Sequence, residues 1–350
     1  MSIKGVLGDG KGQFKKGNYK FGAAVWTNNP NVALVAGRTA FSDNSDASVF
    51  HFRGASWQSE LSRFSSRLSP EDRTQCYVAA YDEEGVWHPW LARPLDEVVA
   101  EISTDWFPAI LGGTGLTSFL QPIFCLNDMK VHGYEALARA CISGKVISGA
   151  ELFSAADSHQ AATRLDAAAR VAAVNVGSAQ LNPDQNLFIN VIPGLMDSDS
   201  AKMPELWQVA EQADMCPSRI VIEFVESHKV SNHESLDVLI TTIREHGAMI
   251  AVDDFGVGYN SLHLIEHIMP DIVKFDRSLL HKQTNAEKEN VVGSLVRYCQ
   301  SLDIRTVAEG VETMEHLAFV QSCGFDMVQG WLIGKPSAEA LRVDHSVWLS

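Results

Sequence analysis

The sequence lacks several features that would each mark a class of protein. No apolar run approaches the roughly 18 residues of a membrane span, and the first residues, MSIKGVLGDGKG, lack the apolar core of a secretion signal. The six cysteines are scattered, with neither a CxxC pair nor a zinc-ligand spacing, and the twelve histidines include no HxH or HExxH grouping. We therefore expect a cytoplasmic protein, away from membranes, whose thiols are reduced.

Positive charge is also scarce. The chain has 28 Lys and Arg residues against 43 Asp and Glu residues, a formal net charge of −15. Residues 1–112 hold 11 basic and 13 acidic residues, which leaves 17 basic and 30 acidic residues in 113–350. An acidic region of this kind repels nucleic acid polymers. If it acts on an anionic substrate, bound metal ions must reverse the local field.

The length of 350 residues favours two domains, and the glycine-rich stretch LGGTGLTS at 111–118 is the predicted boundary. Residues 1–112 contain five of the eight tryptophans, short strand-like segments and helix-like segments at 58–67 and 95–104. They predict a small α+β domain of unknown type, with a regulatory or sensory role. Its GDGKG and GQFKKGN segments lack the spacing and the lysine of nucleotide-binding loops.

Residues 113–350 alternate strand-like and helix-like segments. The predicted strands are 119–124, 131–136, 187–192, 220–225, 249–254, 271–276, 305–310 and 326–331. The predicted helices are 160–177, 205–213, 234–246, 288–301 and 313–323. The first two strands lie too close for a crossover helix and predict a hairpin. This α/β pattern indicates a TIM-like (β/α)8 barrel with an irregular or antiparallel first strand. A doubly wound open sheet is the alternative, but no glycine fingerprint follows its first strand.

Groups that bind metals or move protons stand at the ends of most of these strands. In chain order they are Glu135, Asn190, Glu223, Asp253, Asp254, Lys274, Asp276, Glu309, Glu312 and Gln329. The carboxyl ends of barrel strands meet at one rim, where active sites lie. Each residue alone would ordinarily be a solvated loop residue or a helix cap, yet the repetition over seven strands favours one site. Its oxygen ligands suit Mg²⁺, Mn²⁺ or Ca²⁺ and suffice for a two-metal hydrolytic centre.

Eight motifs in one order carry a family resemblance. They are QPI (121–123), YEALARA (134–140), IN (189–190), EFVE (223–226), DDFGVGYNSL (253–262), KFD (274–276), AEGVET (308–313) and QGWLIGKP (329–336). Together they resemble the EAL domain, the bacterial cyclic di-GMP phosphodiesterase module, over residues 113–350. The DFG in the fifth motif does not indicate a kinase, because the HRD loop and the glycine-rich phosphate loop are missing from the sequence.

The resemblance implies a barrel with one reversed strand that hydrolyses cyclic di-GMP to linear pGpG with Mg²⁺ or Mn²⁺. The implied metal ligands are Glu135, Asn190, Glu223, Asp253, Asp254 and Asp276. Glu309 would be the general base, and Lys274 would hold the attacking water or the phosphate. The implied substrate contacts are Gln121, Leu137, Arg139 and Gln329. The implied supporting residues are Glu226, which would anchor the loop after the fifth strand, and Glu312.

Three positions depart from the family pattern, although none of them removes an implied ligand. Val257 and Asn260 stand where the family usually has a Thr or small residue and a Ser, and Ile192 replaces a common Ser. The loop of Val257 and Asn260 is linked in the family to metal binding and dimer contact, so these residues bear on rate and on coupling across the implied homodimer.

Two other readings of the sequence stay open. The barrel could be a catalytically silent cyclic di-GMP receptor that acts through protein partners, although such domains typically lose the first Glu or the Asp pair, and both are present. In a third reading, residues 1–112 bind a protein and the barrel is a scaffold.

Overall fold

The computed structural model describes residues 22–36, 49–82, 85–86, 88–192, 203–225, 233–256, 261–281 and 286–343. The chain forms two compact units. The first holds Met1–Pro108 and Ser154–Gln160, and the second holds Ala109–Phe153 and Ala161–Ser350. Helices α5 (Phe107–Leu111) and α6 (Gly149–Ser158) contribute residues to both units. The assignment of residues 1–112 to a regulatory domain stays a prediction, as do the effects of Glu226, Val257 and Asn260, which lie outside the described residues.

The first unit contains a four-stranded antiparallel sheet in the order β2-β1-β3-β4. The strands are β1 (Gly22–Thr27), β2 (Val49–Arg53), β3 (Cys76–Ala80) and β4 (Arg93–Pro94). The helices are α1 (Pro30–Ala36), α2 (Trp57–Ser65), α3 (Pro70–Arg73), α4 (Leu95–Ser103) and a 3-10 turn at Pro89–Leu91.

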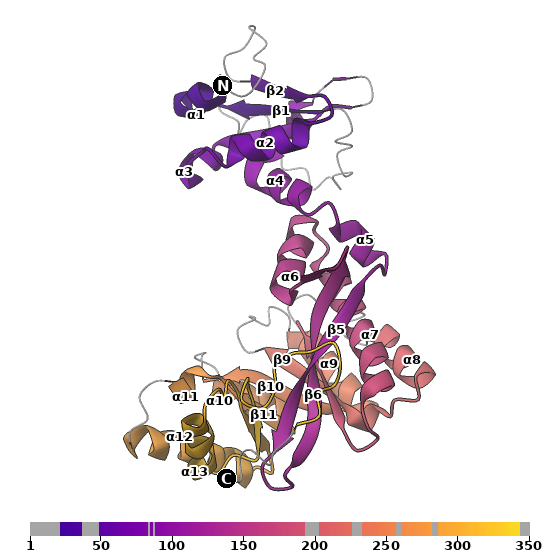
Figure 1. Cartoon of the computed structure of the whole chain (residues 1–350), viewed down its shortest axis with the longest axis vertical. Coiled ribbons are helices and arrows are strands. Elements are labelled where there is room, and N and C mark those ends of the chain that lie inside the picture. Colours follow the sequence, from indigo (N-terminus) through magenta and orange to yellow (C-terminus); the bar gives the residue numbers. More distant parts are fainter. Residues whose placement is uncertain are drawn as a thin grey trace. The chain divides into compact units, whose positions relative to one another are not determined.

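Helices α2 and α4 cover one face of this sheet (Figure 1). In α2, the buried side chains of Trp57, Leu61 and Phe64 recur at helical spacing and form the apolar stripe that packs on the sheet. Cys76 and Val78 contribute from the strand side. The predicted helices at 58–67 and 95–104 are therefore confirmed, with small shifts of their ends.

The second unit is a closed barrel of eight strands. Its strands are β5 (Leu116–Cys125), β6 (Lys130–Ile142), β8 (Asn186–Val191), β9 (Ile220–Val225), β10 (Met249–Phe255), β11 (Ile272–Phe275), β12 (Arg305–Ala308) and β13 (Met327–Gln329). The order is β5-β13-β12-β11-β10-β9-β8-β6, and pairing of β5 with β6 closes it. Strand β5 is antiparallel to both neighbours, while the remaining pairs of the barrel are parallel. The predicted barrel with a reversed first strand and its opening hairpin are confirmed.

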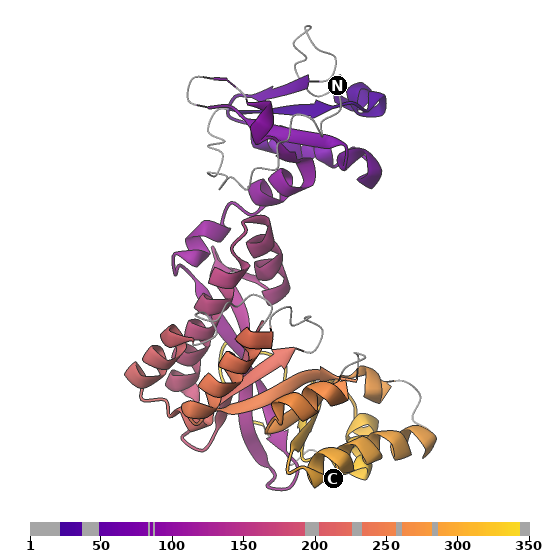
Figure 2. The ribbon, with the colours of Figure 1, turned by 180° about the vertical axis from the view of Figure 1, so that it is seen from behind.

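Helices lie outside these strands, as the two opposite views in Figures 1 and 2 show. They are α7 (Ala162–Gln180), α8 (Pro204–Gln212), α9 (His233–Glu245), α10 (Ser261–Ile268), α11 (Ser278–His281), α12 (Ala286–Ser301) and α13 (Met314–Cys323), with β7 (Lys145–Ile147) beside β6 and a 3-10 turn at Pro217–Arg219. Within the described ranges, no helix has the length and apolar character needed to span a bilayer.

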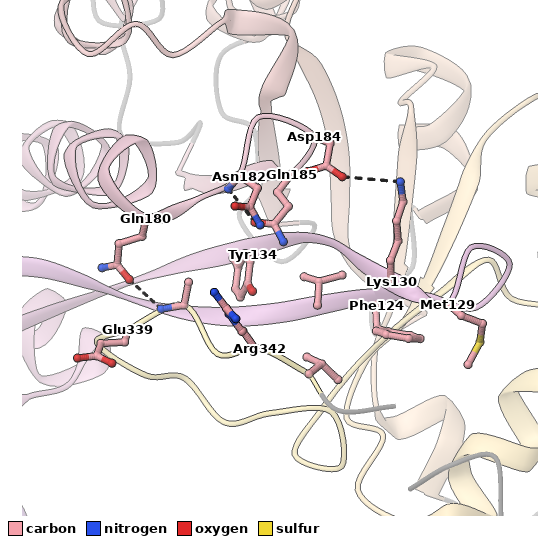
Figure 3. A pocket seen from close by; sticks show the side chains of 13 residues that line it. Phe124, Met129, Lys130, Tyr134, Gln180, Asn182, Asp184, Gln185, Glu339 and Arg342 are labelled. Atoms are coloured by element: carbon pink, nitrogen blue, oxygen red, sulfur yellow. Dashed lines mark hydrogen bonds and ion pairs between the residues drawn. The ribbon is translucent and has the colours of Figure 1, made fainter. Parts of the chain in front are cut away.

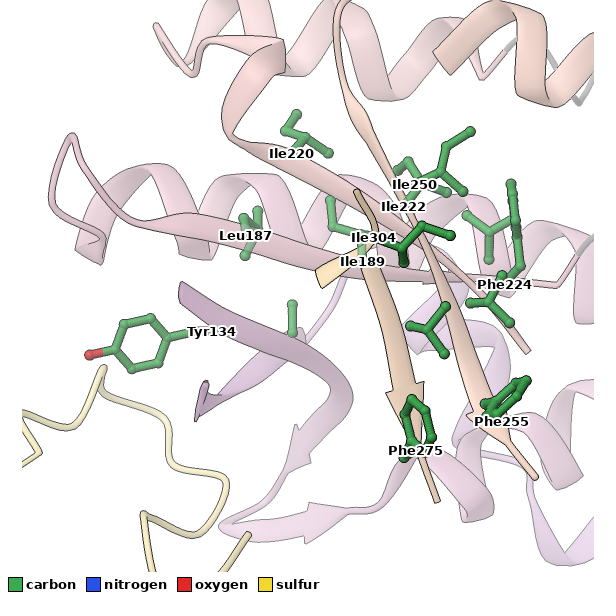
Figure 4. Close-up of a cluster of buried hydrophobic side chains, with 14 of the residues drawn as sticks. Tyr134, Leu187, Ile189, Ile220, Ile222, Phe224, Ile250, Phe255, Phe275 and Ile304 are labelled. Atoms are coloured by element: carbon green, nitrogen blue, oxygen red, sulfur yellow. The ribbon is translucent and has the colours of Figure 1, made fainter. Parts of the chain in front are cut away.

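The main apolar core lies between the strands and these helices (Figure 4). Leu187 and Ile189 of β8, and Ile220 and Ile222 of β9, point into it. Since successive side chains of a strand point to opposite faces, the residues between them point into the barrel. That interior holds the candidate site.

Candidate active site

The interior of the barrel is built in two layers. The lower layer is a cluster of buried apolar side chains, one from each of seven strands: Ile123, Phe188, Val221, Ala251, Ile272, Val307 and Met327. Two residues further along each parallel strand, on the same face, comes a polar group. These groups are Asn190, Glu223, Asp253, Lys274, Glu309 and Gln329.

Strands β5 and β6 complete the upper layer. Because β5 runs in the opposite direction, its polar residue Gln121 comes two residues before Ile123. Gln121 is paired in register with Glu135 of β6. The barrel thus brings together residues separated by more than 190 positions, since Gln329 donates a hydrogen bond of 2.7 Å to Glu135.

Lys274 occupies the centre of the upper layer and is completely buried. Its ammonium nitrogen lies 2.7 Å from Glu309, 3.0 Å from Glu223, 3.2 Å from Asp253 and 3.4 Å from Glu135. Burial alone would lower the pKa of Lys274, but these four carboxylates together raise it well above its usual value. Lys274 is therefore a fixed positive charge among the acidic groups.

The four carboxylates differ in proton affinity because their surroundings differ. Burial opposes the charge of Glu135, but Lys274 and hydrogen bonds from Gln329 and Asn190 lower its pKa. Burial instead raises the pKa of Glu223 well above its ordinary value, against the effect of Lys274. Burial likewise raises the pKa of Glu309 to about 8. Adjacent carboxyl groups with pKa values pushed apart are typical of acid–base sites.

Asp253 and Asp254 are neighbours in sequence, so a regular strand would point them to opposite faces. The pairing of β10 with β11 shifts register between Val252 and Phe255, and Asp254 takes a left-handed backbone with φ of 57°. Asp is one of the few residues that adopt this conformation readily. As a result, carboxylate oxygens of Asp253, Asp254 and Glu309 all lie within 4.8 Å of one another. Burial, together with Asp253 and Asp276, raises the pKa of Asp254.

The donor set fits a hard divalent cation. The three grouped carboxylates supply oxygen ligands, and the buried Glu223 Oε2 and Gln329 Oε1 have no hydrogen-bond partner among the described residues. The amide nitrogen of Asn190 donates 2.8 Å to Glu135, which leaves its amide oxygen as a further acceptor. Oxygen ligands in this number suit Mg²⁺, Mn²⁺ or Ca²⁺ rather than zinc.

Other predicted site residues lie around this centre. Asp276 is half-buried, and its carboxylate accepts a hydrogen bond of 2.8 Å from the backbone of Ser278 at the start of α11, which is the helix-capping contact. Glu312 is exposed beyond β12. Leu137 and Arg139 follow Glu135 on the same face of β6 and are half-buried.

Two features of the site were missed by the sequence reasoning. Phe119 lies on the same face of β5 as Gln121, and the Arg139 guanidinium stands 5.6 Å from the centre of its ring. Alternation along the strand would have found it. Asp166 and Arg170 form a buried ion pair in α7, and Asp166 also binds the backbone of Ile192, directly after β8. No local sequence signal marks that pair.

A cavity of about 770 Å³ lies at the other, amino-terminal ends of β6 and β8 (Figure 3). Several of its polar groups form hydrogen bonds to the backbone of residues 338–341, near the C-terminus. The Tyr134 hydroxyl donates 2.8 Å to the carbonyl of Leu341, and the Gln180 amide binds the backbone of both Ala338 and Ala340. None of the residues that line it belongs to the carboxylate cluster.

Known proteins resemble parts of this chain. The cyclic di-GMP phosphodiesterase NbdA of Pseudomonas aeruginosa is 29% identical over 220 residues, which are 62% of this chain and 28% of that protein. The probable cyclic di-GMP phosphodiesterase PdeB of Escherichia coli is 29% identical over 228 residues, 63% of this chain and 43% of that protein. The blue light- and temperature-regulated antirepressor BluF of Escherichia coli is 28% identical over 155 residues, 43% of this chain and 38% of that protein. This chain spans less than half the length of each.

Two solved structures share the fold. A standalone EAL protein from Vibrio cholerae, bound to c-di-GMP, has a TM-score of 0.60 at 24% identity, over 67% of this chain and 97% of that chain. Klebsiella pneumoniae BlrP1, in a calcium and cyclic di-GMP complex, has a TM-score of 0.60 at 23% identity, over 92% of this chain and 98% of that chain. The EAL domain model matches residues 107–336, about two thirds of the sequence. The chain therefore belongs to the EAL domain family.

Proposed function

We propose that this chain hydrolyses cyclic di-GMP to linear pGpG. The observation that supports this most directly is the upper layer of the barrel, where Glu135, Glu223, Asp253 and Glu309 surround the buried Lys274. Every acidic position that the family resemblance implies is present in the sequence. Among the relatives, NbdA is named a cyclic di-GMP phosphodiesterase and PdeB a probable one.

The metals in this proposal are two Mg²⁺ or Mn²⁺ ions. The residues that would hold them are Glu135, Asn190, Glu223, Asp253, Asp254 and Asp276. Bound there, the ions would stabilise negative charge on the attacking and leaving oxygens of the phosphodiester.

The remaining residues bind the substrate and move the proton. Glu309, whose pKa is raised by burial, is suited to take a proton from the attacking water. The Lys274 ammonium, 2.7 Å from Glu309, fixes that carboxylate and faces the developing charge. Gln121, Leu137, Arg139 and Gln329 would contact the dinucleotide, with Arg139 suited to a phosphate or a guanine edge.

Turnover of cyclic di-GMP with Mg²⁺ or Mn²⁺, followed by chromatography of pGpG, tests this function. We expect Glu135→Ala and Glu309→Ala each to reduce the rate to background, Glu135→Ala mainly through lost metal. Removal of metal by EDTA should stop the wild-type reaction reversibly. Absence of turnover in the wild-type chain, or near-normal rates in either variant, would overturn the assignment.

A second candidate function is that of a catalytically silent cyclic di-GMP receptor. It draws on the similarity to BluF, whose name describes an antirepressor. Tight binding of cyclic di-GMP without turnover in Mg²⁺ or Mn²⁺ would favour it over hydrolysis.

We further propose that the enzyme acts in the bacterial cytoplasm as a homodimer through its barrel and that residues 1–112 regulate it. The dimer is tested by sedimentation, and regulation by comparing turnover of the full chain with that of residues 113–350.

A further inference from the structure

Helix α7 contacts strand β8 near both ends of the strand. At the lower end, Gly177 packs so closely on Leu187 that an added Cβ would meet its side chain at 2.6 Å. At the upper end, the carboxylate of Asp166 accepts a hydrogen bond from the backbone N–H of Ile192. The helix from Asp166 to Gly177 and the extended chain from Leu187 to Ile192 each span about 16 Å. The two contacts therefore match along elements that run in opposite directions.

The upper contact lies where the pairing of β8 with its neighbours ends. Pairing with β6 extends to Ile189, and pairing with β9 extends to Val191. Ile192 is the next residue, and a helix side chain receives its N–H. Two residues earlier, the Asn190 amide donates 2.8 Å to Glu135 inside the barrel. A shift of this strand end would move the Asn190 amide away from that contact.

The acceptor belongs to a buried ion pair. Asp166 and Arg170 are each only 4% exposed and are paired along α7. Replacing such a pair by apolar residues of similar volume is often neutral or even stabilising. Stability alone therefore does not account for two charges at these positions. Apolar residues could not accept the N–H of Ile192, whereas a carboxylate is a strong acceptor and Arg170 favours its charged form.

We propose that Asp166, with Arg170, is a positioning residue for the metal site: it fixes the end of β8 and so orients the Asn190 amide. This inference rests on the metal ligands of the proposed function and adds a supporting pair to them. Residues that orient the ligands of a metal typically change its affinity by about 10–100-fold when they are lost. Because Asp166 acts through the backbone, we expect the lower end of that range.

Two double variants of the full-length chain separate the hydrogen bond from the charges. Asp166→Leu with Arg170→Met fills the space but removes the acceptor for Ile192. Asp166→Asn with Arg170→Met is equally uncharged but keeps a side-chain oxygen as the acceptor. We expect the Kd for Mn²⁺, measured by electron paramagnetic resonance, to rise about tenfold with Leu and by less than about threefold with Asn.

The kinetics should follow the same order. The Mn²⁺ concentration for half-maximal turnover should rise with Leu and return towards the wild-type value with Asn. The KM for cyclic di-GMP at saturating Mn²⁺ should change less, because neither residue is expected to contact the substrate. Glu135→Ala, which removes an implied ligand, identifies the Mn²⁺ signal of the barrel and should abolish it.

The matched control is Gly177→Val, which disturbs the packing of α7 on Leu187 at the lower end. It should lower the melting temperature and leave the Kd for Mn²⁺ unchanged. Equal Kd values in the two double variants, or a Kd in Gly177→Val raised as much as with Leu, would overturn the positioning role and leave the proposed function standing. If the Leu variant does not fold, Asp166→Ala with Arg170→Met takes its place. If the wild type binds no Mn²⁺ in the barrel, both proposals fail.

Discussion

The two layers inside the barrel come from the same strands yet do different work. Ile272 and Lys274 lie two residues apart on β11, about 7 Å along the strand. Ile272 belongs to an apolar layer that fills the interior, whereas Lys274 is surrounded by four carboxylates. The difference indicates that stability and chemistry are separated along the barrel axis. Substitutions in one layer should therefore have consequences that substitutions in the other do not.

The largest effect should come from Lys274→Met, which removes the shared positive charge. Loss of one partner from a buried ion pair typically costs about 3–5 kcal/mol. The raised pKa values of Glu223 and Glu309 mean that these groups take up protons readily, so the loss should be greater at pH 8 than at pH 6. Urea unfolding of the metal-free protein at the two pH values measures it, and turnover should fall to background.

Two control variants make this comparison specific. Ile272→Ala should cost about 2–4 kcal/mol through lost packing, equally at both pH values, and should keep turnover per folded molecule. Lys145→Met removes a lysine whose side chain is 71% exposed and should change neither property. Equal pH dependence in Lys274→Met and Ile272→Ala would contradict the separation of the layers.

The sequence predicts most of the barrel and the composition of its upper layer. Composition and pattern identified β9, the strand that bears Glu223, and helix α7. Strand β9 is a short run of Ile, Val and Phe around that one Glu, and α7 is 19 residues long with no Pro to interrupt it. The reversed direction of β5 followed from the short connection to β6. The local sequence pattern could not predict geometry that depends on all the strands together. The burial of Lys274 among four carboxylates is an example.

Two further details depend on tertiary contacts rather than local pattern. The left-handed backbone at Asp254 arises from a shift in pairing between β10 and β11, which a single strand cannot reveal. The buried pair of Asp166 and Arg170 lies within one helix, but its contact with Ile192 joins that helix to the end of β8. Helix α6 was not predicted from the sequence, because it has only ten residues and therefore a short apolar stripe.

An intermediate effect should come from pH at the lower end of the barrel. His132 accepts hydrogen bonds at Nε2 from Asn186 at 2.9 Å and from Arg305 at 3.3 Å, so it is neutral in the folded barrel. Burial, with Arg305 and Lys130, lowers its pKa to about 4. The unfolded chain binds a proton near pH 6.5, so stability should fall by about 2 kcal/mol between pH 6.5 and 4 and no further from this group below that.

Urea unfolding at half-unit pH steps, compared with His132→Gln, isolates this contribution. Gln can still accept one hydrogen bond but has no proton to gain. The difference in unfolding free energy between the two proteins should shrink as the pH falls from 6.5 to 4. A difference that stays constant across that range would show that His132 is not the group responsible.

The smallest effect should come from Asp254→Asn in the upper layer. Asn tolerates the left-handed backbone that Asp254 adopts at φ of 57°, so the substitution leaves the conformation unchanged. It removes one negative charge beside Asp253 and Asp276, both of which raise the pKa of Asp254. In EDTA at pH 8, the melting temperature should rise, by an amount equivalent to about 0.5–1 kcal/mol, while turnover with metal falls.

Asp303→Asn is the matched control, because Asp303 is exposed and has nearly the same backbone, with φ of 59°. It makes the same chemical change at the same conformation, away from the carboxylate cluster, and should alter neither stability nor turnover. If Asp254→Asn gains stability and Asp303→Asn does not, the repulsion within the upper layer is a cost that the fold carries for its chemistry. If both variants gain stability equally, the gain comes from the left-handed backbone that the two residues share. Charge repulsion would then not destabilise the upper layer relative to the lower one.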